Sequence, residues 1–169
     1  MKKTLLLIML TLIIGCAETK KIVKEKTVLP PDFEGKVSQT EIDYLTKTYF
    51  LGDKEILIIN YKPPRSHCHF NNYQKIKTSQ KWWNKFYSEI DLPKSKVINI
   101  YSEASKVSSY LNNKTDFKDY NNYLLNKFFL VKKDCWGLIM FHKNGNYIQK
   151  MGHYYKEDIL AYKAKLKNN

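Results

Sequence analysis

The chain has 169 residues, and its hydrophobic fraction of 43% and aromatic fraction of 14% favour a folded protein over a disordered one. Its 29 lysines and arginines against 16 acidic residues give a formal net charge of +13, which raises the question of an anionic partner. Arg65 is the only arginine, whereas base readout and bidentate phosphate contacts favour the planar guanidinium of arginine. The composition therefore argues against nucleic acid as a partner and leaves weak attraction to anionic lipid headgroups.

The first sixteen residues have the pattern of an export signal. Lys2 and Lys3 are followed by a mainly apolar run over residues 5–14, and Gly15 then precedes Cys16. Such a run is too short to cross about 30 Å of hydrocarbon as a helix, so it predicts a signal peptide and not a membrane span. The ending at Gly15-Cys16 resembles the lipobox of bacterial lipoproteins.

That resemblance implies that residues 1–15 are a lipoprotein signal peptide and that Cys16 becomes the lipidated N-terminus, with palmitate as the expected acyl group. The protein would then be held on a membrane of the bacterial cell envelope and face the periplasm or the cell exterior. The alternative is an ordinary cleaved signal peptide with an incidental cysteine. Residues 16–38 are rich in lysine and lack apolar periodicity, so they predict a tether before a domain over residues 39–169.

The first half of this domain predicts a helix, a strand and a long helix. Residues 39–50 have apolar side chains at helical spacing. Residues 55–61 form a short, continuous apolar run that is typical of a buried strand, and Pro63 must end it. A second helix is predicted from about residue 70 to residue 90. On this helix we expect Trp83, Phe86 and Ile90 to lie in the core. Trp82 and Tyr87 are expected to stay partly exposed.

The second half predicts a strand, two helices, a hairpin and a closing helix. Residues 97–101 form a second buried strand, and Ser105 can cap a short helix after it. A helix is expected from Asp116, followed by an extended piece to residue 131. Residues 137–142 and 147–151 predict two strands joined by an Asn144-Gly145 turn, and residues 157–166 a final helix.

This order of elements, with an Asn-Gly hairpin before the last helix, resembles the thioredoxin fold. The likeness is greatest to membrane-tethered thiol–disulfide oxidoreductases and peroxiredoxin relatives of bacterial envelopes, and it covers roughly residues 56–166. It implies a three-layer α/β sandwich with a central mixed sheet flanked by helices. The family has a Cys-x-x-Cys motif after the first strand and a cis-proline before the third. Here the loop contains the single Cys68, and Trp136, next to Cys135, falls near the proline position.

The resemblance also implies that Cys68 and Cys135 are spatial neighbours, because these two loops face each other in the fold. They are the only cysteines apart from Cys16, and exported proteins with two cysteines usually pair them. The hypothesis is a Cys68–Cys135 disulfide that is either catalytic or a structural staple. In the catalytic reading, Cys68 lies near a helix N-terminus and Cys135 resolves the mixed disulfide. Three basic side chains would then favour the Cys68 thiolate, namely Arg65, His67 and His69.

Other chemistries have weaker sequence support. The tripeptide His67-Cys68-His69 contains ligand types suited to copper or zinc, but the loop holds one cysteine, so we expect neither a metal nor a cofactor. Ser66 lacks the Gly-x-Ser-x-Gly surroundings of a hydrolase nucleophile. Two functions stay open: a thiol–disulfide redox protein with envelope clients, or a non-catalytic envelope protein that binds or scaffolds partners.

Overall fold

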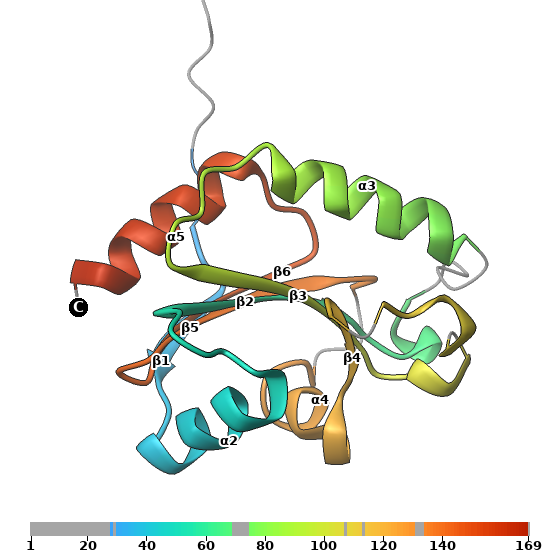
Figure 1. Cartoon of the computed structure of the whole chain (residues 1–169), viewed down its shortest axis with the longest axis horizontal. Helices are drawn as coiled ribbons and strands as arrows, with labels where there is room; N and C mark the ends of the chain where they lie inside the picture. The colour runs from blue at the N-terminus through green and yellow to red at the C-terminus, as the bar shows by residue number, and fades with distance from the viewer. Residues whose placement is uncertain are drawn as a thin grey trace, which may run out of the picture.

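The computed structural model describes residues 28, 30–68, 75–106, 108–112, 114–130 and 134–168. The predicted signal peptide, Cys16 and His69 lie outside these residues. A six-stranded mixed sheet forms the middle layer, with α3 and α5 on one face and α2 and α4 on the other (Figure 1). The expectation of an α/β fold with a central mixed sheet flanked by helices is confirmed.

The sheet has the strand order β1-β6-β5-β2-β3-β4. Its strands are β1 (Phe33–Lys36), β2 (Ile56–Lys62), β3 (Ser95–Tyr101), β4 (Asp116–Lys118), β5 (Gly137–His142) and β6 (Asn146–Met151). The longer helices are α2 (Gln39–Tyr49), α3 (Ile76–Ser88), α4 (Tyr123–Lys127) and α5 (Lys156–Asn168). Short 3₁₀ turns complete the described elements: η1 (Arg65–His67), η2 (Ala104–Lys106), η3 (Ser108–Tyr110) and η4 (Tyr120–Asn122). This six-strand order is not the standard thioredoxin order.

Strand β2 is the centre of the sheet. It pairs in parallel with β3 and antiparallel with β5, so both of its edges are hydrogen-bonded. Its residues from Ile56 to Tyr61 are all buried, because helices cover both faces. This is the environment that a continuous apolar run predicts, and the strands expected over residues 55–61, 97–101, 137–142 and 147–151 are confirmed.

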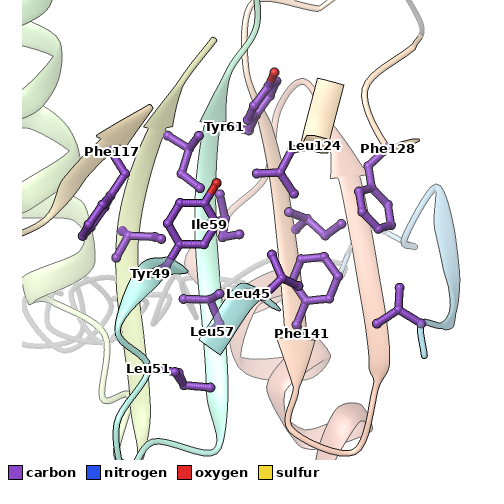
Figure 2. Packing of buried hydrophobic residues seen from close by; sticks show 14 of the residues in the cluster. Leu45, Tyr49, Leu51, Leu57, Ile59, Tyr61, Phe117, Leu124, Phe128 and Phe141 are labelled. Atoms are coloured by element: carbon purple, nitrogen blue, oxygen red, sulfur yellow. The ribbon is translucent and has the colours of Figure 1, made fainter. Parts of the chain in front are cut away.

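Two apolar cores lie on the two sides of the sheet. In the first, Leu45 and Tyr49 of α2 pack on Ile59 and Phe141 of the strands, as Figure 2 shows. The second lies between the sheet and helices α3 and α5 and includes Ile159 of α5. Alternate residues of β2 enter opposite cores, as the two-residue period of a strand requires.

The exposure expected along α3 is partly wrong. Tyr87 is buried rather than partly exposed, and its hydroxyl lies 3.0 Å from the hydroxyl of Tyr154. Trp83 and Phe86 are only half-buried at the margin of the second core, whereas Ile90 is buried as expected. A tyrosine can be buried here because Tyr154 satisfies its polar end. Trp82 is 56% exposed, as expected.

Strand β1 falls inside the segment predicted as a tether. Its four residues pair antiparallel with β6, with Phe33 opposite Gln149 and Lys36 opposite Asn146. All four residues are exposed, so the strand lacks the alternation of apolar and polar residues from which a strand can be predicted. The described fold therefore begins before residue 39.

The helix predicted from Asp116 is replaced by a strand and a short helix. Residues 116–118 form β4, which pairs in parallel with β3. Asn121 and Asn122 have left-handed backbone conformations (φ 56° and 52°) that interrupt any continuous helix. Asp119 then caps α4, because its carboxylate accepts hydrogen bonds from the Leu124 and Leu125 backbone N–H groups (3.0 and 2.9 Å). The helix predicted after Ser105 is also wrong: η2 and η3 stand there instead.

Helix α2 begins with a capping box. The Ser38 hydroxyl accepts a hydrogen bond from the Glu41 backbone N–H (3.3 Å), and the Glu41 carboxylate accepts one from the Ser38 N–H (3.0 Å). Glu41 also pairs with Lys127, at the end of α4, and accepts a hydrogen bond from the Tyr123 hydroxyl (2.8 Å). One carboxylate thus joins α2 to α4.

This arrangement predicts an acid-sensitive contribution to stability. The hydrogen bond from Lys127 lowers the pKa of Glu41 to about 2, and the Ser38 and Tyr123 contacts add to it. A lowered pKa stabilises the fold at neutral pH, and this stabilisation is lost as the pH falls from about 5 towards 2. We expect Glu41→Gln to lower the free energy of unfolding at neutral pH by about 1 kcal/mol, since the pair is partly solvated.

The measurement is urea unfolding of both proteins at neutral and acid pH. The difference between them should shrink as the pH approaches 2. Lys127→Met is the matched variant: it should remove most of the same stability, and the double variant should lose little more. A difference that stays constant with pH would contradict the role given to this carboxylate.

Candidate functional site

The candidate site is the disulfide between Cys68 and Cys135. Cys68 immediately follows η1, shortly after the end of β2, and Cys135 lies two residues before β5 begins. Because β2 and β5 are antiparallel neighbours, with Tyr61 opposite Gly137, the end of one lies beside the start of the other. The two cysteines are bonded, with their Cα atoms 4.6 Å apart and a separation of 67 positions in the chain. The expected pairing is present.

The loop before Cys68 is shaped by two prolines. Pro63 and Pro64 follow β2 and cannot continue its ladder as donors. The Pro64 carbonyl accepts the His67 N–H (2.9 Å), and the Arg65 carbonyl accepts the Cys68 N–H (3.1 Å). Cys68 follows this 3₁₀ turn, beyond the carboxyl end of β2, and is bonded there to Cys135 before β5.

Arg65 is held by an acidic partner. Its backbone N–H donates to the Glu103 carboxylate (2.9 Å), and its Nε lies 3.7 Å from the same oxygen. Burial tends to raise the pKa of Glu103, but hydrogen bonds from the Lys106 side chain and the Arg65 N–H hold it below its usual value. The positive charge of Arg65 is therefore balanced by Glu103, which weakens any effect of Arg65 on a nearby thiolate.

Helix α3 does not begin at Cys68. The helix starts at Ile76, and its N-cap residue, Lys75, makes no side-chain capping hydrogen bond. The favourable field of a helix end falls off within about one turn. Within the described residues, Cys68 thus lacks the helix N-terminus that the catalytic reading requires. His67 is buried beside it in the chain, and His69 lies outside the described residues.

The start of β5 is packed against an aromatic stack. The rings of Tyr61 and Phe129 lie 4.1 Å apart and nearly parallel (12°). Gly137 faces this stack so closely that a Cβ atom there would lie 2.3 Å from Phe129 Cε1. The Tyr61 hydroxyl donates to Asp119 (3.0 Å). The strand next to Cys135 is consequently fixed by close packing as well as by the sheet.

Trp136 stands where the resembled family has a proline. Its carbonyl accepts a hydrogen bond from the Gly152 N–H (3.0 Å), and its ring meets the His153 ring edge to face at 5.2 Å. These contacts tie the segment after Cys135 to the end of β6. Both cysteines are 7% exposed, so solvent reaches little of the bridge.

A buried polar network crosses the sheet on the α3 side. Asn60 donates to Asn99 (2.9 Å), and Asn99 donates to Asp116 (2.8 Å), which links β2, β3 and β4. The Tyr154 hydroxyl donates to Asn60 (3.1 Å), so the adjoining Tyr87 hydroxyl must donate to Tyr154. Burial raises the pKa of both tyrosines, which keeps these donors protonated.

Sequence reasoning missed this network, although a signal for it exists. Asn60 and Asn99 are polar residues inside two apolar runs, and they are opposite each other in the β2–β3 register. Gln80 of α3 completes the network by donating to Asp116 (3.0 Å). Two positions along β2, Lys62 lies on the same side of the strand, and burial lowers its pKa to about 8.

The copper or zinc site suggested by His67-Cys68-His69 would need Cys68 as a free thiolate. Cys68 is bonded to Cys135 and cannot act as a thiolate ligand in this state. In the described part of the chain, no three His, Cys, Asp or Glu residues lie close enough together to hold a metal ion. His142 is engaged locally, where its Nδ1 accepts the Asn144 N–H (3.3 Å).

No helix among the described residues is long and apolar enough to cross a membrane. In comparisons with protein-family models, with curated proteins and with solved structures, no match to this chain was found.

The geometry predicts that the disulfide contributes to stability. Closing a long loop removes conformational freedom from the unfolded chain, typically worth about 2–4 kcal/mol. We expect Cys68→Ala, Cys135→Ala and the double variant to lose similar amounts of unfolding free energy, measured by urea unfolding. Adding a reductant should destabilise the parent protein and leave the double variant unchanged. Equal stability of the parent and the double variant would show that the bridge stabilises nothing.

Proposed function

We propose that this chain is a lipid-anchored protein of the bacterial cell envelope whose thioredoxin-like domain binds or scaffolds partners and uses its disulfide structurally. The observation that carries the proposal is the burial of both bonded cysteines, which lie in two different loops that each hold a single cysteine. Thiol–disulfide exchange requires that a client thiolate reach one sulfur along the axis of the bond, and access is restricted when both cysteines are 7% exposed.

The thioredoxin-like assignment draws support from the inner part of the sheet. Strands β2 and β3 are parallel and are connected through α3, while β5 and β6 form an antiparallel hairpin that leads into α5. This is the β-α-β unit followed by a β-β-α unit on which the resemblance rests. Strands β1 and β4 are additions at the two sheet edges.

Envelope localisation draws support from chemistry rather than from coordinates. A disulfide persists in oxidising compartments and is rare in the reducing cytosol. The Cys68–Cys135 pair therefore agrees with the export signal and the lipobox-like residues before Cys16. Bidentate phosphate recognition needs arginine, and Arg65 is paired with Glu103, so nucleic acid is not among the proposed partners.

A second candidate function is thiol–disulfide exchange with envelope clients. It is favoured by the position of the bridge, which lies beyond the carboxyl ends of the parallel strands β2 and β3, where α/β proteins place their sites. In such a cycle a client thiolate would attack one sulfur and displace the other cysteine as a thiolate. A second client thiolate would then release the client as a disulfide and leave Cys68 and Cys135 reduced.

A redox titration separates the two functions. The chain from Glu18 onward would be equilibrated in glutathione buffers, alkylated and mapped by mass spectrometry. A structural bridge should resist reduction until the potential falls below about −300 mV. Reduction between about −120 and −270 mV would instead place the protein with exchange catalysts, as would client adducts trapped by Cys135→Ser on non-reducing gels.

The anchor is tested independently of the disulfide. Cells expressing the full chain would be fed labelled palmitate, and the protein would be isolated from membranes. We expect label on the parent chain and none on Cys16→Ser, which should also accumulate at the uncleaved mass. Label that persists in the variant, or a parent chain without label, would contradict lipidation at Cys16.

A further inference from the structure

Helix α3 presents a basic face that contains one exposed tryptophan. Trp82 is 56% exposed, and its ring is stacked on Phe86 (5.2 Å between centroids, 14°) and meets Trp83 edge to face. The side chain is therefore held along the helix and not folded into the core. An indole that is supported from below and open above suits a boundary between water and an apolar phase.

The charged residues within α3 and at its N-cap are all lysines. Lys75, Thr78, Lys81 and Lys85 are exposed and lie within about a third of a turn of Trp82 on the helix. Helix α3 contains no acidic residue, and Glu89, just past its end, is paired with Lys156. Lysines four positions apart repel one another on a helix, and an anionic partner would relieve that repulsion.

The opposite face of α3 is committed to the core. Ile76 and Tyr87 are buried, and Trp83 packs against Tyr154 (5.4 Å). No other described element covers the outer side of α3, which forms one outer layer of the molecule together with α5 (Figure 1). With its apolar face in the core, α3 presents to solvent a lysine-rich face carrying a tryptophan, and these side chains suit the anionic headgroup region of a membrane.

We propose that this outer face of α3 docks on the anionic lipid surface of the membrane that carries the anchor. The inference rests on the proposed lipidation only for the choice of membrane. Val28 lies twelve positions after Cys16, a span that reaches at most about 43 Å, so the domain stays near the bilayer. Lysines act as point charges on lipid headgroups and need no bidentate geometry, and Trp82 inserts at headgroup level.

Vesicle binding tests the proposal without the lipid anchor. The chain from Glu18 onward lacks the signal peptide and Cys16 but contains every described element. It would be sedimented with vesicles of phosphatidylcholine alone and with an equal mixture of phosphatidylcholine and phosphatidylglycerol. We expect binding to the anionic vesicles to exceed binding to the neutral ones by at least about tenfold, and to fall as salt is added.

Matched variants locate the surface. Lys81→Glu with Lys85→Glu should reduce anionic-vesicle binding by about tenfold or more, whereas Lys47→Glu with Lys114→Glu makes the same charge change at exposed sites elsewhere and should reduce it much less. Trp82→Ala should reduce binding several-fold, and Phe33→Ala, which alters a comparably exposed ring on β1, should not. Circular dichroism would confirm that each variant is folded.

Three results would overturn the proposal. The first is equal loss of binding in the two charge-reversal variants, which would show that vesicle binding depends on the net charge of the protein and not on the outer face of α3. The second is vesicle binding that does not depend on Trp82 or on anionic lipid. The third is binding of a single-stranded oligonucleotide as strongly as the vesicles and through the same lysines. None of these results bears on lipidation at Cys16, which the palmitate experiment tests by itself.

Discussion

The bond between Cys68 and Cys135 is the constraint on which the candidate site depends. The sheet places the end of β2 beside the start of β5, but two prolines end β2 and release the chain from the ladder. The following loop makes a 3₁₀ turn, and Arg65 in it contacts Glu103. The disulfide fixes that loop against the neighbouring strand, and the close packing of Gly137 on Phe129 gives it a rigid support. The bond and the burial of both cysteines support the proposal that the bridge is structural and not an exchange catalyst.

The polar network under α3 links strands β2, β3 and β4 beside the candidate site. Asn60, Asn99 and Asp116 come from three adjacent strands. Asn60 donates to Asn99 and Asn99 donates to Asp116, so both buried amides keep hydrogen-bond partners. Tyr87 connects the network to α3 through Tyr154. The inner face of the helix is thus set by specific hydrogen bonds, which determines the side chains that its outer face presents to solvent. The lysines and Trp82 face outward because Ile76 and Tyr87 must face inward.

The sequence predicted those parts of the fold whose side chains report their burial. Continuous apolar runs identified β2, β3 and β5, and Asn144-Gly145 identified the hairpin. Strand β1 could not be found in this way, because its residues are all exposed and the sheet ladder alone holds it. The sequence pattern predicts a helix in place of strand β4, because the strand has only three residues and its formation depends on β3. In the site, the resemblance implies the pairing of the cysteines, whereas the Arg65–Glu103 pair is a tertiary contact that no local pattern encodes.

The central claim is that the bridge forms in the cell and persists there as a structural element. The most direct measurement is to block free thiols with an alkylating agent as cells are lysed, and then to map the unreduced protein by mass spectrometry. The account predicts one cross-linked peptide pair containing Cys68 and Cys135, with no detectable alkylation at either residue. Both cysteines recovered as alkylated thiols, or bonded to peptides of other proteins, would contradict it.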